Sequence, residues 1–322
     1  MIFSVVTPTH FRPEKLRLLL ASLEQQSLPM DQFEVILVPS PNDAGLKNLP
    51  PTKLRLQILS ADNDPFSGTS ASYKRNAGAR AAKAPWLAFI DDDCVADKNW
   101  LRHAQKRLQS NECQAIEGLT KIPSPEKMTY TYKGLQRLSK AGGYQTCNMF
   151  YKKDVFLDCG GFDLNFPFYL EDTDLAWTLL DRGYKIVFDE TCIVEHPVPA
   201  ADVNRLLYNA YRARLIPYLY KKHLLLFKSQ GWKALQRFQW AFLVIHTALL
   251  LWLLISPTWE RAFTVVGFAC MLSAVYTAKQ LRGCSFSINE AFKMWMYYII
   301  TPWITIFQLW RGNLKQKTFV WR

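Results

Sequence analysis

A short apolar run that ends in three consecutive acidic residues constrains the fold of this chain more than any other feature. Residues 84–97 read APWLAFIDDDCVAD, so that the apolar run Trp86–Ile90 leads directly into Asp91, Asp92 and Asp93. An apolar run of this length is consistent with a fully buried strand, although periodicity alone also allows a helical segment. If it is a strand, the three acids stand at its carboxyl end, where ligands bind in open α/β sheets.

Three adjacent carboxylates repel one another, and a hard divalent cation with oxygen ligands neutralises them well. Mg²⁺ and Mn²⁺ hold diphosphates in the same way. An acidic surface turn is the structural alternative for such a triplet. Because a buried strand is predicted to run directly into the acids, we favour a metal site, with Mg²⁺ or Mn²⁺ as the expected cofactor.

The first 200 residues alternate between strand and helix patterns. Apolar, β-branched runs predict strands at 3–6, 33–38, 54–59, 86–90, 115–122, 146–151 and 184–188, and a last strand that ends at 193–196. Helical spacing or alanine-rich composition predicts helices at 14–26, 70–83 and 100–108, and residues 123–143 are predicted to form a loop. Strand–helix–strand units make parallel sheets, so this region is predicted to be an α/β nucleotide-binding domain.

A second acidic cluster, EDTD, starts a predicted helix at residues 171–174. Carboxylates are favourable at a helix N-terminus, so capping alone would explain them. A second cluster in the same α/β domain argues instead for a functional role. His196 follows the last predicted strand, and at that position it is a candidate third metal ligand beside Asp91 and Asp93.

Charge is divided unevenly along the chain. Residues 1–200 hold 23 Lys+Arg and 24 Asp+Glu, a net −1, whereas residues 201–322 hold 16 and 3, a net +13. A basic region that is also aromatic and apolar indicates an anionic membrane surface rather than nucleic acid as the partner. Seven cysteines without a CxxC pair indicate reduced thiols, and no signal peptide is predicted.

The C-terminal part is predicted to be helical and attached to a membrane. Residues 201–237 are predicted to form amphipathic interfacial helices, and uncharged runs at about 238–256 and 262–278 approach the length that spans a bilayer. Lys and Arg flank the outer ends of this hairpin, which places both ends, and the catalytic domain, on the cytosolic side of the cell's inner (cytoplasmic) membrane. The stretch 292–310, which contains Pro302, is expected to be an interfacial or re-entrant helix. The alternative is a water-soluble tail that uses these runs as a dimer core.

Taken together, five marks in order resemble the family 2 glycosyltransferases, inverting enzymes with a GT-A fold. The marks are VVTPTHFRP after the first strand, RNAG before the fourth, the DDD triplet, GGFD followed by EDTD, and a closing strand with His196. The resemblance covers about residues 2–200. It implies a mixed, mainly parallel α/β sheet of GT-A type, a nucleotide-sugar donor and a divalent metal.

The resemblance also implies roles for individual residues. It implies a nucleotide pocket lined by Thr9, His10, Arg12, Arg75 and Asp92. It implies a metal site in which Asp93 is the foremost ligand, with Asp91 and His196 beside it.

Two further marks concern the donor sugar and the acceptor. Gly142-Gly143 resembles the glycine loop that faces the donor sugar. Asp172 of the Glu171-Asp172 pair resembles the catalytic base.

One loop departs from the family pattern. The family usually carries acids after the second strand, one of which contacts the base of the nucleotide. Here residues 38–43 read VPSPND, and Pro39 cannot make that contact, which leaves Ser40, Asn42 and Asp43 as alternatives. A nucleotide donor therefore follows from the resemblance, whereas uridine specificity does not.

The expected activity is transfer of a sugar from a nucleotide sugar to a lipid-linked or polysaccharide acceptor at the cytoplasmic face. The metal and Arg75 would stabilise the charge on the leaving diphosphate, while Asp172 takes the proton of the attacking hydroxyl. Two other functions are compatible with the sequence. One is a nucleotidyltransferase, and the other is a non-catalytic membrane adaptor that retains the fold.

Overall fold

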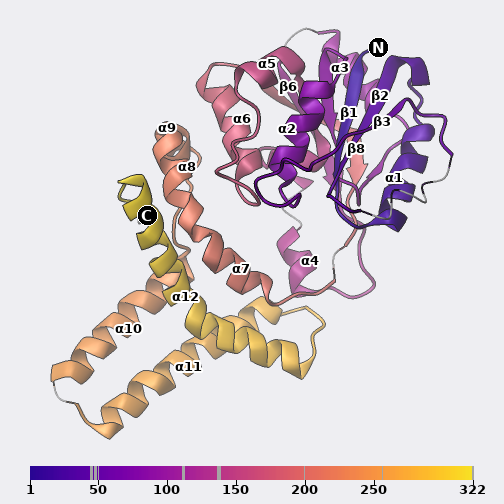
Figure 1. The fold of residues 1–322 in the computed structure, drawn as a ribbon. Coiled ribbons are helices and arrows are strands. Elements are labelled where there is room, and N and C mark those ends of the chain that lie inside the picture. Colours follow the sequence, from indigo (N-terminus) through magenta and orange to yellow (C-terminus); the bar gives the residue numbers. More distant parts are fainter. Residues whose placement is uncertain are drawn as a thin grey trace. The chain divides into compact units, whose positions relative to one another are not determined.

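The computed structural model describes residues 1–43, 46, 49, 51–110, 113–135, 139–198, 200–255 and 257–320, and they form two compact units (Figure 1). The sheet unit comprises Met1–Pro123 and Gln136–Val198. The helical unit comprises Ser124–Leu135 and Pro199–Arg322. A short segment from within residues 1–200, the range expected to form the catalytic domain, thus belongs to the helical unit.

In the described residues, the sheet unit is built on a mixed eight-stranded sheet with the order β3-β2-β1-β4-β7-β6-β8-β5. Its strands are β1 (Phe3–Thr9), β2 (Phe33–Pro39), β3 (Leu56–Ile58), β4 (Trp86–Phe89), β5 (Val95–Ala96), β6 (Ala115–Lys121), β7 (Met149–Lys152) and β8 (Ile186–Glu195). Strands β3, β2, β1 and β4 run parallel, whereas β7 is antiparallel to both β4 and β6. Parallel strands of this kind end together at one edge of the sheet.

Helices cover both faces of this sheet (Figure 1). They are α1 (Pro13–Glu24), α2 (Ala71–Ala81), α3 (Trp100–Leu108), α5 (Lys153–Asp158) and α6 (Glu171–Asp181), with short 3₁₀ turns η1 (Met30–Gln32) and η4 (Thr146–Asn148). Apolar side chains of α1 and α3 pack on one face, and those of α2, α5 and α6 pack on the other. Because both faces are covered, every residue of β1 and β2 is buried, which explains their continuous apolar sequences.

Most predicted strands and helices form close to their predicted residues, with three differences. The prediction of a loop at 123–143 was wrong for Tyr130–Leu135, which form helix α4; Thr131 and Tyr132 are buried there, so that packing outweighs weak local propensity. The separate strands expected at 184–188 and up to 196 are one strand, β8, because its pairing with β6 continues through a register shift at Gly118/Leu119. Strand β5 was not predicted, since two residues carry no periodic signal.

The helical unit contains α4 and a series of C-terminal helices. They are α7 (Arg205–Arg212), η5 (Ala213–Leu215), α8 (Ile216–Lys222), α9 (Leu224–Ser229), α10 (Arg237–Ile255), α11 (Trp259–Leu281) and α12 (Ile288–Gln316). Helix α12 begins with a capping box at Ser287 and Glu290 and continues through Pro302 without a break. It packs against α7, α8 and α11, and Gly312 permits the closest approach, because a Cβ there would lie 2.4 Å from the backbone oxygen of Arg214.

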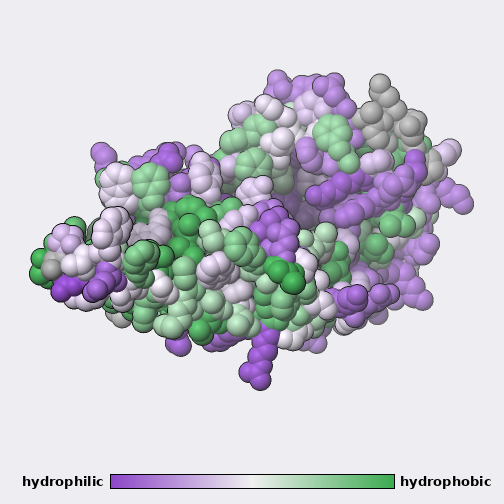
Figure 2. Space-filling model, turned by 90° about the horizontal axis from the view of Figure 1, so that it is seen from below, coloured by the Kyte–Doolittle hydropathy of each residue, from purple (hydrophilic) through white to green (hydrophobic). Residues whose placement is uncertain are grey.

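Two helices of this unit, α10 and α11, are long and apolar enough to cross a membrane. Only 17% and 22% of their most apolar stretches are buried, unlike the core helix of a water-soluble protein. Figure 2 shows hydrophobic side chains gathered side by side on the helical unit. An apolar surface of this extent indicates contact with lipid or another apolar partner.

Candidate functional site

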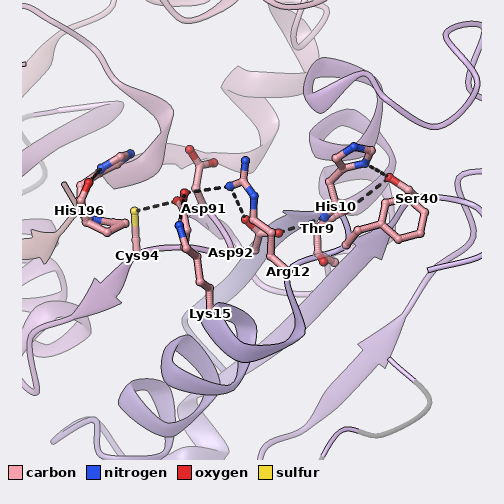
Figure 3. Close-up of polar contacts among 12 residues, drawn as sticks. Thr9, His10, Arg12, Lys15, Ser40, Asp91, Asp92, Cys94 and His196 are labelled. Atoms are coloured by element: carbon pink, nitrogen blue, oxygen red, sulfur yellow. Dashed lines mark hydrogen bonds and ion pairs between the residues drawn. The ribbon is translucent and has the colours of Figure 1, made fainter. Parts of the chain in front are cut away.

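The carboxyl ends of β1, β2 and β4 meet at one edge of the sheet, and their loops build the first half of the site. The backbone N–H of Ser40 donates to Thr9 O (3.1 Å) just beyond β1 and β2, and that of Ile90 donates to Val6 O (3.3 Å). The side chains of the three loops therefore converge (Figure 3). This convergence follows from the parallel pairing of β1 with both neighbours.

The first acidic cluster, Asp91–Asp93, is bound by cationic side chains and by one backbone N–H. Asp92 accepts hydrogen bonds from the His10 N–H (3.0 Å) and from Arg12 Nη1 (3.1 Å). The same Arg12 atom lies 2.8 Å from Asp93 Oδ2, and Lys15 Nζ lies 3.7 Å from it. Burial raises the pKa of Asp92 to about 6, although the His10 N–H and the Arg12 charge oppose this shift.

A buried lysine links the first two loops of the site. Lys74 Nζ donates to Thr9 O (2.8 Å) and to Ser40 Oγ (2.7 Å), and Ser40 Oγ also lies 2.6 Å from His10 Nδ1. Burial lowers the pKa of Lys74 to about 8, against the charges of nearby aspartates. Sequence reasoning singled out the neighbouring Arg75 but missed Lys74. The signal was present, because two consecutive cations interrupt an alanine-rich helix.

The loop that departs from the family pattern also contributes to the site. Asp43 Oδ2 accepts the N–H of Phe11 (2.8 Å), which has a positive φ of 50°. Ser40 and Asp43, two of the three alternatives to Pro39, therefore both contact the loop that follows β1. For Asn42 we find no such contact among the described residues.

Arg75 connects the two acidic clusters. Its Nη2 donates to Asp91 Oδ1 (2.7 Å), while Nη1 lies 3.7 Å from Glu171 Oε1 and 3.8 Å from Asp172 Oδ1. Only 6% of the Arg75 side chain is exposed. Burial by itself would lower the pKa of Arg75, but the surrounding carboxylates raise this pKa by more than burial lowers it. The guanidinium therefore stays charged.

The second acidic cluster starts helix α6 and is partly neutralised. Asp172 accepts hydrogen bonds from the N–H (3.2 Å) and the hydroxyl of Thr146. Burial and the adjacent Asp172 charge raise the pKa of Glu171 to about 8, with Arg75 opposing. Burial also raises the pKa of Asp172, but Arg75 and both Thr146 donors oppose that shift. Arg75 opposes the shift at both residues, but Thr146 donates only to Asp172, so the ionised form of Asp172 has more hydrogen-bond donors than that of Glu171.

The glycine loop is bound to a glutamate that sequence reasoning missed. Glu117, in the middle of β6, accepts the backbone N–H groups of Gly142 (2.8 Å), Gly143 (2.9 Å) and Tyr144 (2.7 Å). Burial raises the pKa of Glu117, although these three donors oppose the shift. No sequence signal identifies this residue, because a single acid in a strand is normally an exposed edge residue.

Three potential metal-binding side chains lie together at the ends of β4 and β8. Ligand atoms of Asp93, Cys94 and His196 lie within 4.8 Å of one another. His196 Nδ1 lies 2.8 Å from Pro197 O and donates to it in the neutral ring, which leaves Nε2 as the metal-binding atom. Two cations already converge on Asp93 Oδ2, so this oxygen attracts positive charge. Asp93 and His196 offer an oxygen and a nitrogen that fit a divalent cation such as Mn²⁺, whereas the Cys94 thiol, which was not anticipated, is a soft ligand that suits neither Mg²⁺ nor Mn²⁺. Asp91 instead accepts a hydrogen bond from Arg75.

A parallel-strand edge that combines two acidic clusters, buried cations and a potential metal site defines an α/β domain built to bind a nucleotide or another phosphorylated ligand. Comparison with known proteins identifies the class. Residues 67–172 match the model of the glycosyl transferase family 2. The chain therefore contains a glycosyltransferase family 2 domain of GT-A type, and it is a glycosyltransferase that uses a nucleotide-sugar donor.

Individual relatives support this assignment. Glycosyltransferase AglE of Haloferax volcanii is 26% identical over 223 residues, which cover 65% of this chain and 70% of the relative. A glucosyl-dolichyl phosphate glucuronosyltransferase of the same organism is 27% identical over 108 residues, 29% of this chain and 34% of that protein.

A solved structure shows the same fold. The mannosyltransferase PcManGT of Pyrobaculum calidifontis, in complex with GDP-Man and Mn²⁺, superposes with a TM-score of 0.62 at 15% identity, over 94% of this chain and 86% of that one. The predicted family and fold class, a mixed and mainly parallel α/β sheet of GT-A type followed by helices, are thus confirmed.

Proposed function

We propose that this chain is a membrane-attached, metal-dependent, inverting glycosyltransferase. It transfers a sugar from a nucleoside diphosphate sugar to a lipid-linked or glycan acceptor at the cytoplasmic face of the membrane. One observation carries this proposal: Arg75 joins the acid triplet on the donor side to the Glu171–Asp172 pair on the acceptor side. The carboxylates proposed to act on the leaving group and those proposed to act on the attacking hydroxyl therefore contact the same buried guanidinium.

Arg75 suits a leaving diphosphate. In the described part of the chain, its Nε and Nη1 atoms are buried and donate no hydrogen bond. The carboxylates of Glu171 and Asp172 lie 3.7 and 3.8 Å from Nη1, too far for a hydrogen bond, so an anionic ligand that accepts from Nε or Nη1 is favoured. In the reaction these atoms would stabilise the negative charge that develops on the diphosphate. A divalent cation held by Asp93 and His196 would supply further positive charge for the same purpose.

Asp172 is the proposed base. Two Thr146 donors favour the ionised form of Asp172, and burial raises the pKa of Glu171 to about 8, so we assign the shared proton to Glu171. Asp172 then accepts the proton of the acceptor hydroxyl as that oxygen attacks the anomeric carbon. Thr146 and Arg75 hold the Asp172 carboxylate in one orientation. Attack from the side opposite the diphosphate gives inversion in one displacement, and no covalent enzyme intermediate is required.

The donor and the metal are tested together on detergent-solubilised protein. We would record release of nucleoside diphosphate from UDP-, GDP- and dTDP-sugars, with and without Mn²⁺ or Mg²⁺. The variants are Asp93→Ala and, as the matched control, Asp31→Ala, an exposed aspartate before β2 at the opposite ends of the strands. Metal-dependent release that Asp93→Ala removes and Asp31→Ala retains supports the proposal. Release of pyrophosphate would identify a nucleotidyltransferase instead, and no release from any donor would overturn the proposal.

Helix α12 supports membrane attachment through an inverted distribution of side chains. Its buried face includes polar residues, namely Thr301, Thr305, Gln308 and Asn313. Its exposed face carries large apolar residues at three- and four-residue spacing, namely Ile288, Phe292, Met296, Ile300, Trp303, Phe307, Trp310 and Leu314. Water favours the reverse arrangement, whereas lipid favours this one.

The apolar stripe runs along the whole of α12, about 43 Å at 1.5 Å per residue. It continues past the charged residues Lys293 and Arg311. We therefore infer that α12 lies in the plane of the membrane interface, while α10 and α11 cross the bilayer as a hairpin. Flanking cations at Arg237 and Lys279 place both outer ends in the cytosol.

A reporter that fluoresces only when it folds in the cytosol tests this topology in intact cells. Fusion at the N-terminus and after residue 322 should give fluorescence, and insertion between Pro257 and Thr258 should abolish it. Equal protein levels on blots are the control. Fluorescence from the 257–258 insertion, or a dark C-terminal fusion, would contradict the hairpin. A dimer core in water would instead give detergent-free soluble protein.

A further inference from the structure

Glu117 is an unusual residue for the interior of a sheet. It lies between Met149 of β7 and Phe188 of β8, and only 4% of its surface is exposed. Both carboxylate oxygens are used, because Oε2 accepts from Gly142 while Oε1 accepts from Gly143 and Tyr144. A buried carboxylate with three backbone donors is stable in its ionised form only while that turn stays in place.

The turn that surrounds this carboxylate has a demanding conformation. Gly142 and Tyr144 have positive φ angles of 83° and 53°. Three successive N–H groups that point to one side form a nest for an anion. Here the anion is the protein's own Glu117, which offsets the conformational cost of the turn.

The same short segment continues to the second acidic cluster. Two residues beyond Tyr144, Thr146 donates its N–H and its hydroxyl to Asp172. The neighbour of Glu117, Gly118, lies against the next part of the segment, because a Cβ there would lie 2.4 Å from Asn148 Oδ1. The adjacent residues Glu117 and Gly118 of β6 thus contact both ends of the segment 142–148.

We propose that Glu117 is a positioning residue, whose buried carboxylate holds the Gly142–Tyr144 turn and, through Thr146, orients Asp172 for proton transfer. This inference rests on the proposed function, because it takes Asp172 as the base. It assigns Glu117 no contact with the substrate. The carboxylate acts through the backbone of the turn.

The test compares Glu117→Gln with a matched control, Glu34→Gln. Glu34 is also buried, with 5% of its surface exposed, and also accepts protein donors, from the Ser4 hydroxyl (2.6 Å) and the Lys83 N–H (2.7 Å). It lies in β2 outside the site. Glutamine keeps the shape of either side chain but offers only one acceptor oxygen. Glu117 uses both oxygens and therefore loses at least one donor, whereas both donors to Glu34 bond to Oε1, so Glu34→Gln removes the buried charge and can keep both contacts.

Hydrogen exchange of the Gly142–Tyr144 amides is the first readout. Loss of a buried hydrogen bond should accelerate exchange there by about tenfold in Glu117→Gln. Glu34→Gln should leave these amides unchanged. Glu117→Asp, which retains two carboxylate oxygens, should restore part of the protection and also serves if the glutamine variant does not fold.

Kinetics give the second readout. Glu117→Gln should lower kcat for glycosyl transfer by about tenfold, the effect of one lost buried hydrogen bond at the upper end of its usual range, while the Kd values for UDP and GDP stay within about twofold of those of the unmodified protein. Glu34→Gln should keep kcat. A Glu117→Gln protein with normal exchange at 142–144, or with normal kcat, would overturn the proposal.

Asp172→Asn separates this inference from the proposed function. If Asp172→Asn loses turnover with normal exchange at 142–144, the base assignment holds. The role of Glu117 is then tested by hydrogen exchange and kcat of the Glu117→Gln variant. If Asp172→Asn keeps turnover, the proposed function fails, and with it the claim that Glu117 orients a base. The exchange data would then decide only whether Glu117 anchors the turn.

Discussion

The two acidic clusters of the sheet unit solve the same electrostatic problem differently. Asp93 faces Arg12 and Lys15, whose side chains are 46% and 49% exposed. The pair Glu171–Asp172 faces Arg75, whose side chain is 6% exposed. An exposed cation can move aside for a metal ion or a ligand at little cost, whereas a buried cation cannot. Asp93 in the first cluster is therefore suited to exchanging partners, whereas Asp91 and the second cluster, which share the buried Arg75, are suited to keeping one geometry.

The largest effect is expected at the proposed base. Asp172→Asn should lower kcat by roughly 10²–10⁴-fold, the usual contribution of a general base, because an amide cannot accept the hydroxyl proton. Single-turnover transfer with saturating donor and acceptor measures this step. Glu171→Gln, which neutralises a residue that already keeps a proton, is the control and should have a smaller effect. A value of kcat within about threefold of that of the unmodified protein would remove Asp172 from the mechanism.

Arg75→Gln should give the next largest effect. It leaves three partly buried carboxylates without their buried cation, which costs about 3–5 kcal/mol in the free energy of unfolding. Urea denaturation in detergent, followed by the fluorescence of the sheet unit, measures the change. Arg75→Lys should restore part of it, because the charge returns without the planar donor geometry. A loss below about 1 kcal/mol would show that the second cluster does not depend on this charge.

The pH dependence of stability should reveal the proton on Glu171. Its pKa is about 8 in the folded protein and near 4.5 when unfolded. Because the folded value is the higher one, this contribution is fully present below about pH 4.5 and is lost as the pH rises through about 8. With chelator present, the unmodified protein should lose more stability over this range than Glu171→Gln, by more than about 1.4 kcal/mol, one pKa unit. Parallel curves for the two proteins would argue against a protonated Glu171.

Arg12→Gln should have the smallest effect on stability. Its ion pairs with Asp92 and Asp93 are partly exposed, and such pairs contribute about 0–1 kcal/mol. The same urea titration as for Arg75→Gln gives a direct comparison of the two arginines. An Arg12→Gln loss as large as that of Arg75→Gln would break the contrast between an exchangeable cluster and a fixed one.

Much of the site could be predicted from sequence because its residues stand where strands end. The apolar run Trp86–Ile90, which includes β4, leads directly into the acid triplet, and the triplet was assigned to the site for that reason. His10, which follows β1, was assigned through the family resemblance. Glu117 and Cys94 escaped prediction for a different reason. Glu117 lies inside a strand without a local pattern, and its partner Gly142 is 25 residues away in sequence. Cys94 lies just beyond a strand, and its possible role as a ligand depends on His196 at the end of another strand.

The sequence by itself determined most of the succession of strands and helices, apart from α4, β5 and the extent of β8, as well as the position of both acidic clusters and the apolar character of α10 and α11. These follow from periodicity and from uninterrupted apolar runs, which are local properties. Only the tertiary structure decided that Arg75 joins Asp91 to Glu171 and Asp172, and that Glu117 holds the glycine turn. Such contacts depend on the order of strands in the sheet, with β7 antiparallel between β4 and β6, and this order results from packing the whole chain.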